Sequence, residues 1–205
     1  MLFTAGQKQY IDPEVVADWF QMCASALLAQ ENLVKQWFSR GAIGNAPAPL
    51  PKHLKFAPQE QLAKYFSDVY KELELSAILW AVTACESRLR IDLRARLVDN
   101  DFLATQMRNI SNAKSKEFLV PLVDLGIFDC WKLFMRQQIN SDSNVAALGA
   151  VKPLILLRHW LAHGRYWEPT NSAANQPFAT VLSVVLRFYD ALADSAQRGG
   201  IRALA

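Results

Sequence analysis

The chain has 205 residues, of which 52% are hydrophobic and 20% are charged, and this balance excludes a disordered chain. Its formal net charge of +3 permits nucleic-acid binding, but no lysine-rich tail indicates it. The length provides ample core for one domain, so we expect a single soluble domain over residues 1–205.

The first predicted element is a long helix that begins at Asp12-Pro13-Glu14, where an N-cap residue precedes a first-turn proline and an early acid. Apolar residues keep helical spacing up to an end near Gly41. A Pro/Gly-rich connection follows over 41–57, and its lack of periodicity at this length predicts a surface flap over a site. His53 within it is interpreted as a solvated loop histidine.

A second helical pattern runs from Pro58 to about Asp99 and is long enough to accommodate a kink. Glu86 stands out in it because its neighbours at helical spacing are all apolar: Leu79, Val82, Leu89 and Leu93. A carboxylate on a core-facing stripe needs a cation, since burying an unpaired charge is costly. Two cations remain open at this point, Arg158 and, one turn along the same helix, Arg90.

The second half of this helix also has the richest basic surface of the chain, formed by Arg88, Arg90, Arg94 and Arg96. Such a run is usually a solvated helix face, and it also suits contact with a phosphate backbone. Short helices are expected over 101–109 and around 115–120. Residues 127–134 then predict one amphipathic helix, and 140–144 a polar turn.

The last predicted helix follows a polar loop over 168–177 and has the most regular apolar spacing in the chain: Phe178, Val181, Leu182, Val185, Phe188, Tyr189 and Leu192. A loose tail is expected over 197–205. No segment has the alternation of a strand, and no internal repeat is visible. The fold class is therefore predicted as all-α, a single-domain bundle of about five main helices.

The cysteines Cys23, Cys85 and Cys130 are widely separated and odd in number, which favours reduced core thiols over disulfides or a metal site. Residues 1–12 lack the apolar region of a signal peptide. The most apolar window, 73–85, contains Glu74 and is shorter than a membrane span. We therefore expect a reducing, cytoplasmic compartment and no membrane contact. The sequence also contains no Gly-rich phosphate loop, Cys/His metal set or Ser nucleophile elbow, so no cofactor or metal is expected.

The apolar run from Leu154 to Ala162 predicts a largely buried helix with Pro153 in its first turn and Gly164 as its C-terminal cap. Arg158 shares the apolar stripe of this helix and therefore needs a partner or a ligand. His163 comes five residues later, about 140° around an unbroken helix. The two side chains converge on one small anion if the helix ends at His163.

Two interpretations of this pair remain open from spacing alone. His163 is a capping histidine and Arg158 half of a structural ion pair, or the two form a site. A helix C-terminus favours a protonated imidazole, which suits a proton donor near neutral pH. The bare spacing is a weak motif, so its sequence context decides between these interpretations.

The segment Arg158-His159-Trp160-Leu161-Ala162-His163, at the end of an apolar helix and followed by Gly164, resembles the R-x4-H signature of the HEPN superfamily. In that signature a polar residue, usually Asn, Asp or His, follows the arginine, and His159 occupies this position here. The resemblance covers the motif and the all-helical pattern of the chain, and only the motif is specific. It implies an all-α bundle and a metal-independent endoribonuclease.

The resemblance also implies roles for individual residues. Arg158 is expected to clamp the phosphate, His163 to act as the acid–base residue, and His159 to orient the site, with Glu86 as a supporting residue. HEPN ribonucleases dimerise so that two motifs face each other in a composite cleft, and their products are a 2′,3′-cyclic phosphate and a 5′-hydroxyl. Such proteins commonly act as toxins or antiviral effectors beside a restraining partner, so an RNA substrate, a homodimer and an antitoxin or regulatory protein are the implied partners.

One departure concerns the residues after the motif. A HEPN toxin subgroup carries a tyrosine two residues after the histidine, where a partner nucleotidyltransferase modifies it, but this chain has Arg165 there and Tyr166 one later. That puts the modification in doubt. Arg165, Tyr166 and Trp167 are candidates for substrate contact through charge and base stacking, or they simply pack at the helix end.

Two other classes of function stay open. The chain is alternatively a non-catalytic HEPN-like module that binds a nucleotide or a protein partner through Arg158. The second alternative is a structural helical protein in which an Arg–Glu pair only fixes the packing. RNA cleavage without metal separates the nuclease from both.

Overall fold

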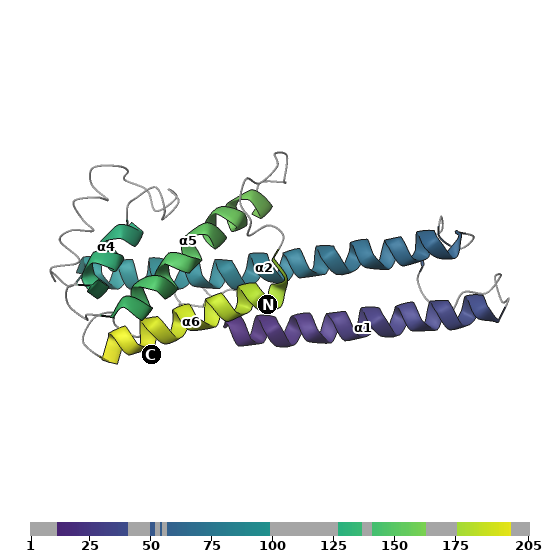
Figure 1. Ribbon diagram of the computed structural model, residues 1–205, viewed down its shortest axis with the longest axis horizontal. Helices are drawn as coiled ribbons and strands as arrows, with labels where there is room; N and C mark the ends of the chain where they lie inside the picture. Colours follow the sequence, from purple (N-terminus) through teal and green to yellow (C-terminus); the bar gives the residue numbers. More distant parts are fainter. Residues whose placement is uncertain are drawn as a thin grey trace. The chain divides into compact units, whose positions relative to one another are not determined.

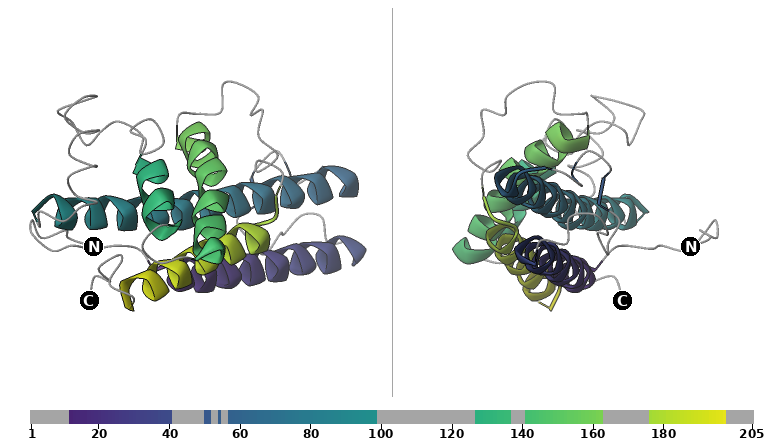
Figure 2. Two further views of the ribbon diagram at one scale, coloured as in Figure 1. Left: turned by 60° about the vertical axis from the view of Figure 1, so that its left-hand side comes forward. Right: turned by 90° about the vertical axis from the view of Figure 1, so that its right-hand side faces the viewer.

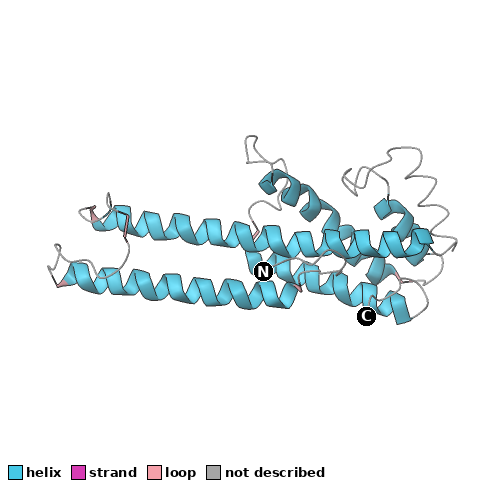
Figure 3. Cartoon of the chain, turned by 180° about the vertical axis from the view of Figure 1, so that it is seen from behind, coloured by secondary structure: helices cyan, strands magenta, loops and turns pink. Residues whose placement is uncertain are grey.

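The computed structural model describes residues 12–40, 50–51, 54, 57–98, 127–136, 141–162 and 176–197. This part of the chain is all-α and contains no strand, as Figure 3 shows. Its five helices are α1 (Pro13–Ser39), α2 (Gln59–Val98), α4 (Ile127–Phe134), α5 (Asp142–Ala162) and α6 (Phe178–Gln197) (Figure 1). The prediction of an all-α protein is confirmed.

The boundaries of four helices follow the sequence signals. α1 begins at Pro13 directly after Asp12, and α2 runs unbroken for 40 residues. α4 and α6 cover the two amphipathic patterns that were predicted. The short helices expected over 101–109 and around 115–120 lie outside the described residues, as does most of the 168–177 loop.

The start of α5 differs from the prediction, because the helix begins at Asp142 and Pro153 lies inside it. Ser141 caps this start, with the backbone N–H of Asn144 donating to Ser141 Oγ at 3.3 Å. The serine N-cap, with the acidic Asp142 in the first turn and Ala146 and Ala147 in the second, outweighs the preference of proline for a first turn. Pro153 has no N–H, so the carbonyl of Gly149 lacks its usual donor within the helix. The predicted polar turn over 140–144 is wrong from Asp142 onward.

The chain divides into two compact units, and α2 contributes to both. One unit comprises Glu14–Ala77, and the other comprises Ile78–Ala205 together with Met1–Pro13. Figure 2 shows the helices of each unit from two further sides. A single domain over 1–205 stays a prediction.

The unit formed by Glu14–Ala77 is a helical hairpin with a small apolar core: Val34, Leu50, Leu54, Ala57, Leu62 and Phe66. Phe20 on α1 also meets Tyr70 on α2 edge to face, with ring centroids 6.0 Å apart. Three of the core residues belong to the connection that was expected to be a surface flap, and that expectation is wrong for them. The remainder of 41–57, including His53 but not Pro51, lies outside the described residues.

In the other unit, α5 packs against α6 and, less extensively, against α4. The buried face of α6 repeats every three or four residues through Phe178, Val181, Val185, Phe188 and Leu192. Trp131 and Met135 at α4 are fully buried. α4 and α5 approach closely at Gly149, where an added Cβ would contact Lys132 Cε at 3.6 Å.

α5 is the one described helix that is long and apolar enough to cross a membrane, with a mean hydropathy of 1.4 in its most apolar window. The window over 73–85 is therefore not the most apolar stretch. Length and composition alone are weak evidence for a span, since the core helix of a soluble protein passes the same test. The buried residues of α5 include Leu148, Val151, Leu154 and Leu157.

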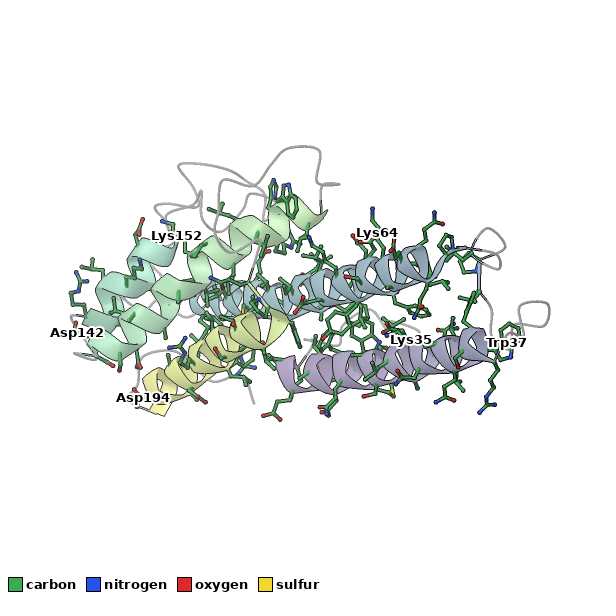
Figure 4. The ribbon with its side chains drawn as sticks, turned by 45° about the vertical axis from the view of Figure 1, so that its right-hand side comes forward. Lys35, Trp37, Lys64, Asp142, Lys152 and Asp194 are labelled. Atoms are coloured by element: carbon green, nitrogen blue, oxygen red, sulfur yellow. The ribbon has the colours of Figure 1, made fainter. Side chains whose placement is uncertain are left out.

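A buried polar contact joins the start of α5 to the end of α6. Asn144 Nδ2 donates a hydrogen bond to Asp194 Oδ2 at 2.7 Å, and Asn144 is buried. Figure 4 labels Asp194 near the end of α6 and Asp142 at the start of α5. This bond fixes the register of α5 on α6, because a one-residue shift of either helix would separate the amide from its carboxylate.

We predict that Asn144→Ala lowers the free energy of unfolding by about 1.5–3 kcal/mol, the range for hydrogen bonds to charged groups. Asp194→Asn is the matched control, because an amide oxygen still accepts the bond, and it should cost less than half as much. Urea unfolding followed by circular dichroism measures both values. Equal losses for the two variants would show that the bond does not carry this stability.

Candidate functional site

The candidate site starts from a buried stripe on the second half of α2. Ile78, Ala81, Val82, Cys85 and Leu89 are each at most 1% exposed, and they recur at helical spacing. Glu86 lies beside this stripe with only 8% of its side chain exposed. The sequence expectation of a carboxylate among apolar neighbours is therefore met.

Arg158 on α5 provides the cation for this carboxylate. Its Nε lies 3.4 Å from Oε2 of Glu86, and 30% of the arginine side chain remains exposed. At this length the contact is an ion pair rather than a short N–H···O hydrogen bond. Of the two cations considered for Glu86, Arg158 is thus the one observed in contact, while the side chain of Arg90 lies outside the described residues.

The geometry of the pair decides what Arg158 can bind. The contact engages Nε, the innermost nitrogen of the guanidinium, and the two outer nitrogens carry four further N–H donors. Those outer nitrogens form the planar fork that matches a phosphate or carboxylate. A partly exposed arginine held from behind by a buried carboxylate is therefore suited to hold one anion.

Of the other motif residues, His159 lies within the described part of α5 and His163 does not. His159 is partly buried on the same helix as Arg158, one residue further along. His163 and the predicted cap Gly164 lie outside the described residues, as do Arg165, Tyr166 and Trp167. The convergence of Arg158 and His163 on one anion thus stays a prediction.

Arg88 on α2 makes a contact that the sequence did not indicate. The guanidinium carbon of Arg88 lies 5.9 Å from the ring centroid of Tyr189 on α6, within the range of a cation–π interaction. Arg88 was predicted as part of a basic surface, and part of its charge is thus directed at an aromatic ring. The helical spacing of either residue gives no signal for this pairing, because it depends on how α6 meets α2.

The described cysteines are free thiols, as predicted for Cys23 and Cys85. Burial raises the pKa of the Cys85 thiol well above its usual range, so this cysteine stays protonated and unreactive near neutral pH. The side chain of Cys130 lies outside the described residues. Within the described ranges, no group of three or more His, Cys, Asp or Glu side chains is placed to hold a metal ion.

No protein-family model, curated protein or solved structure matches this chain.

We predict an asymmetric response when the two members of the ion pair are removed. Arg158→Ala removes one partner of a buried ion pair, so the loss of unfolding free energy should approach the roughly 3–5 kcal/mol typical of that change. Glu86→Gln leaves a partly exposed arginine that water screens, so its loss should stay near 1–2 kcal/mol. Urea unfolding at constant pH measures both.

Lys35→Ala is the matched control, because it breaks an exposed pair within one helix, Lys35 Nζ to Glu31 Oε1 at 2.6 Å. Such pairs contribute about 0.3–0.5 kcal/mol. An Arg158→Ala variant no less stable than Lys35→Ala would contradict the assignment of Glu86 and Arg158 as a stabilising buried pair.

Proposed function

We propose that this chain is a metal-independent endoribonuclease of the HEPN type, acting in the cytoplasm as a toxin or an antiviral-defence effector. The observation that supports the proposal best is the contact of Arg158 with the buried Glu86. It holds the arginine of the R-x4-H motif near the end of α5 while part of its side chain stays exposed. An arginine with the role of a phosphate clamp needs both features.

The proposed reaction is an internal transfer of the phosphodiester. A histidine takes the proton of the ribose 2′-OH, and the 2′-oxygen attacks the adjacent phosphorus. The bond from phosphorus to the 5′-oxygen breaks, and that oxygen receives a proton from an acid. The products are a 2′,3′-cyclic phosphate and a 5′-hydroxyl. Arg158 neutralises the charge that builds on the phosphate oxygens in the transition state.

Acid and base steps at opposite ends of the phosphate call for two proton-transfer groups. His163 supplies one of them in each chain, with His159 orienting the site. A homodimer with facing motifs supplies the second as the His163 of the other copy. In this arrangement Arg165, Tyr166 and Trp167 contact the RNA, and a regulatory protein or antitoxin restrains the enzyme.

A second candidate function is favoured by the same ion pair. A buried Glu86 is by itself a sufficient reason for an arginine at position 158, so Arg158 also fits a structural helical protein. In a non-catalytic HEPN-like module the outer nitrogens of Arg158 bind a nucleotide phosphate or a protein partner without cleavage. RNA cleavage discriminates between the nuclease and both of these alternatives.

The test is incubation of the purified protein with total RNA in EDTA, followed by analysis of the new ends. The wild type should produce cyclic phosphates and 5′-hydroxyls, and His163→Ala should reduce the rate about 10²- to 10⁴-fold, the usual contribution of one acid–base group. Arg158→Lys keeps a positive charge toward Glu86 but loses the planar fork, so it should stay folded and cleave poorly.

Lys152→Ala is the control, because it removes another cation from α5 outside the motif, and it should leave the rate unchanged. Cleavage that is equal in wild type and His163→Ala would identify a contaminating nuclease and overturn the proposal. Protein that binds RNA without cutting it would favour the binding module instead.

A further inference from the structure

α1 carries a second apolar face in addition to the one that packs in the hairpin core. Leu27, Val34 and Phe38 face that core. A second set of side chains lies about 120° around the helix from these, estimated from 3.6 residues per turn, and it includes three strongly exposed apolar residues. These are Val15 at 62%, Met22 at 67% and Leu33 at 54% exposure. An apolar face of this kind on a soluble helix indicates a binding surface.

The spacing on this face is that of a coiled-coil seam. Eight positions alternate by three and four residues, and we define them as the α1 seam: Asp12, Val15, Trp19, Met22, Ala26, Ala29, Leu33 and Gln36. Steps of three and four are the spacing of the a and d positions, at which one helix inserts side chains between those of another. Trp19 is partly buried and the other seven positions are exposed. The pattern therefore favours a helix as the partner.

The sizes of the seam residues are complementary to those of a second, antiparallel copy of the same seam. When two copies of α1 run antiparallel about a two-fold axis at residue 24, Val15 faces Leu33 of the second copy. Trp19 then faces Ala29, and Met22 faces Ala26, so the largest side chains meet the smallest. The outermost layer pairs Asp12 with Gln36. A two-fold interface must be self-complementary in this way.

Charge is compatible with the same pairing. The residues that flank the seam are Asp18, Ser25 and Asn32 on one side and Val16, Cys23, Gln30 and Trp37 on the other. In the antiparallel register Asp18 lies opposite Asn32, whose amide can donate to the carboxylate, and Ser25 lies opposite its own copy. No two like charges face each other along the flanks of the seam.

We propose that the α1 seam is a dimerisation surface that binds a second copy of this chain in antiparallel orientation. The seam extends about 36 Å, taking 1.5 Å per residue, and a helix is about 10 Å wide. This contact strip is small for a protein–protein interface, so the dimer dissociates on dilution. The inference depends on α1 alone and does not depend on the proposed ribonuclease activity.

Two exposed leucines on α1 allow a matched test by sedimentation over a range of concentrations. Leu33 lies in the seam and Leu28 lies on another side of the helix, with similar exposures of 54% and 57%. The wild type should approach twice the mass of one 23.1 kDa chain as concentration rises. Leu33→Glu should remain a monomer over the same range, and Leu28→Glu should behave as the wild type.

A wild type that is monomeric at every concentration would overturn the proposal, as would a dimer that Leu33→Glu leaves intact. Circular dichroism checks that both variants are folded, and the two are a matched pair because the same substitution is made on the same helix. Whether the Leu33→Glu variant cleaves RNA is a separate measurement. The sedimentation result decides the proposal on the α1 seam whichever way that measurement comes out.

Disulfide cross-linking tests the orientation. A chain with both Val15→Cys and Leu33→Cys should form a covalent dimer on oxidation, well above the background of the native cysteines. Each single variant should show only that background, because residue 15 meets residue 33 and not its own copy. Cross-linking of the single variants would show parallel helices and would contradict the antiparallel pairing.

Discussion

The ion pair between Glu86 and Arg158 is the contact on which the candidate site depends. A carboxylate with 8% of its side chain exposed cannot be left alone next to an apolar stripe, because desolvation of an unpaired charge is too costly. The guanidinium that offsets this cost comes from α5, so the charge on α2 determines where the end of α5 can lie. The same contact engages Nε of Arg158 and not its two outer nitrogens.

One polar side-chain contact positions α5 near each of its two ends. Near its start, Asn144 donates to Asp194 and ties α5 to α6. Near its end, Arg158 ties α5 to α2. Between them lies Pro153, which has no N–H to donate to the backbone of the preceding turn. The two side-chain contacts thus fix the start of α5 on α6 and the position of Arg158 on α2.

The sequence was sufficient for most of the helices and for Glu86 as a buried carboxylate, but it left both Arg158 and Arg90 open as the partner of Glu86. Glu86 was identifiable because a charge on an apolar stripe violates the pattern, and Arg158 was identifiable for the same reason. Pro153 was misleading because its first-turn preference is local, whereas the Ser141 cap and the alanines after it decide where α5 begins. The burial of Leu50 and Leu54 had no signal, since a segment without periodicity gives none. The Arg88–Tyr189 contact depends on helix placement, which spacing does not encode.

The most direct measurement of the central claim is a double-mutant cycle on unfolding free energy with Glu86→Gln, Arg158→Met and the double variant. If the buried carboxylate holds the guanidinium, the two changes should be non-additive by roughly 1–3 kcal/mol, and the double variant should be more stable than Arg158→Met alone. Additive losses, with a coupling energy indistinguishable from zero, would show that Glu86 does not position Arg158 and would remove the basis of the proposed site.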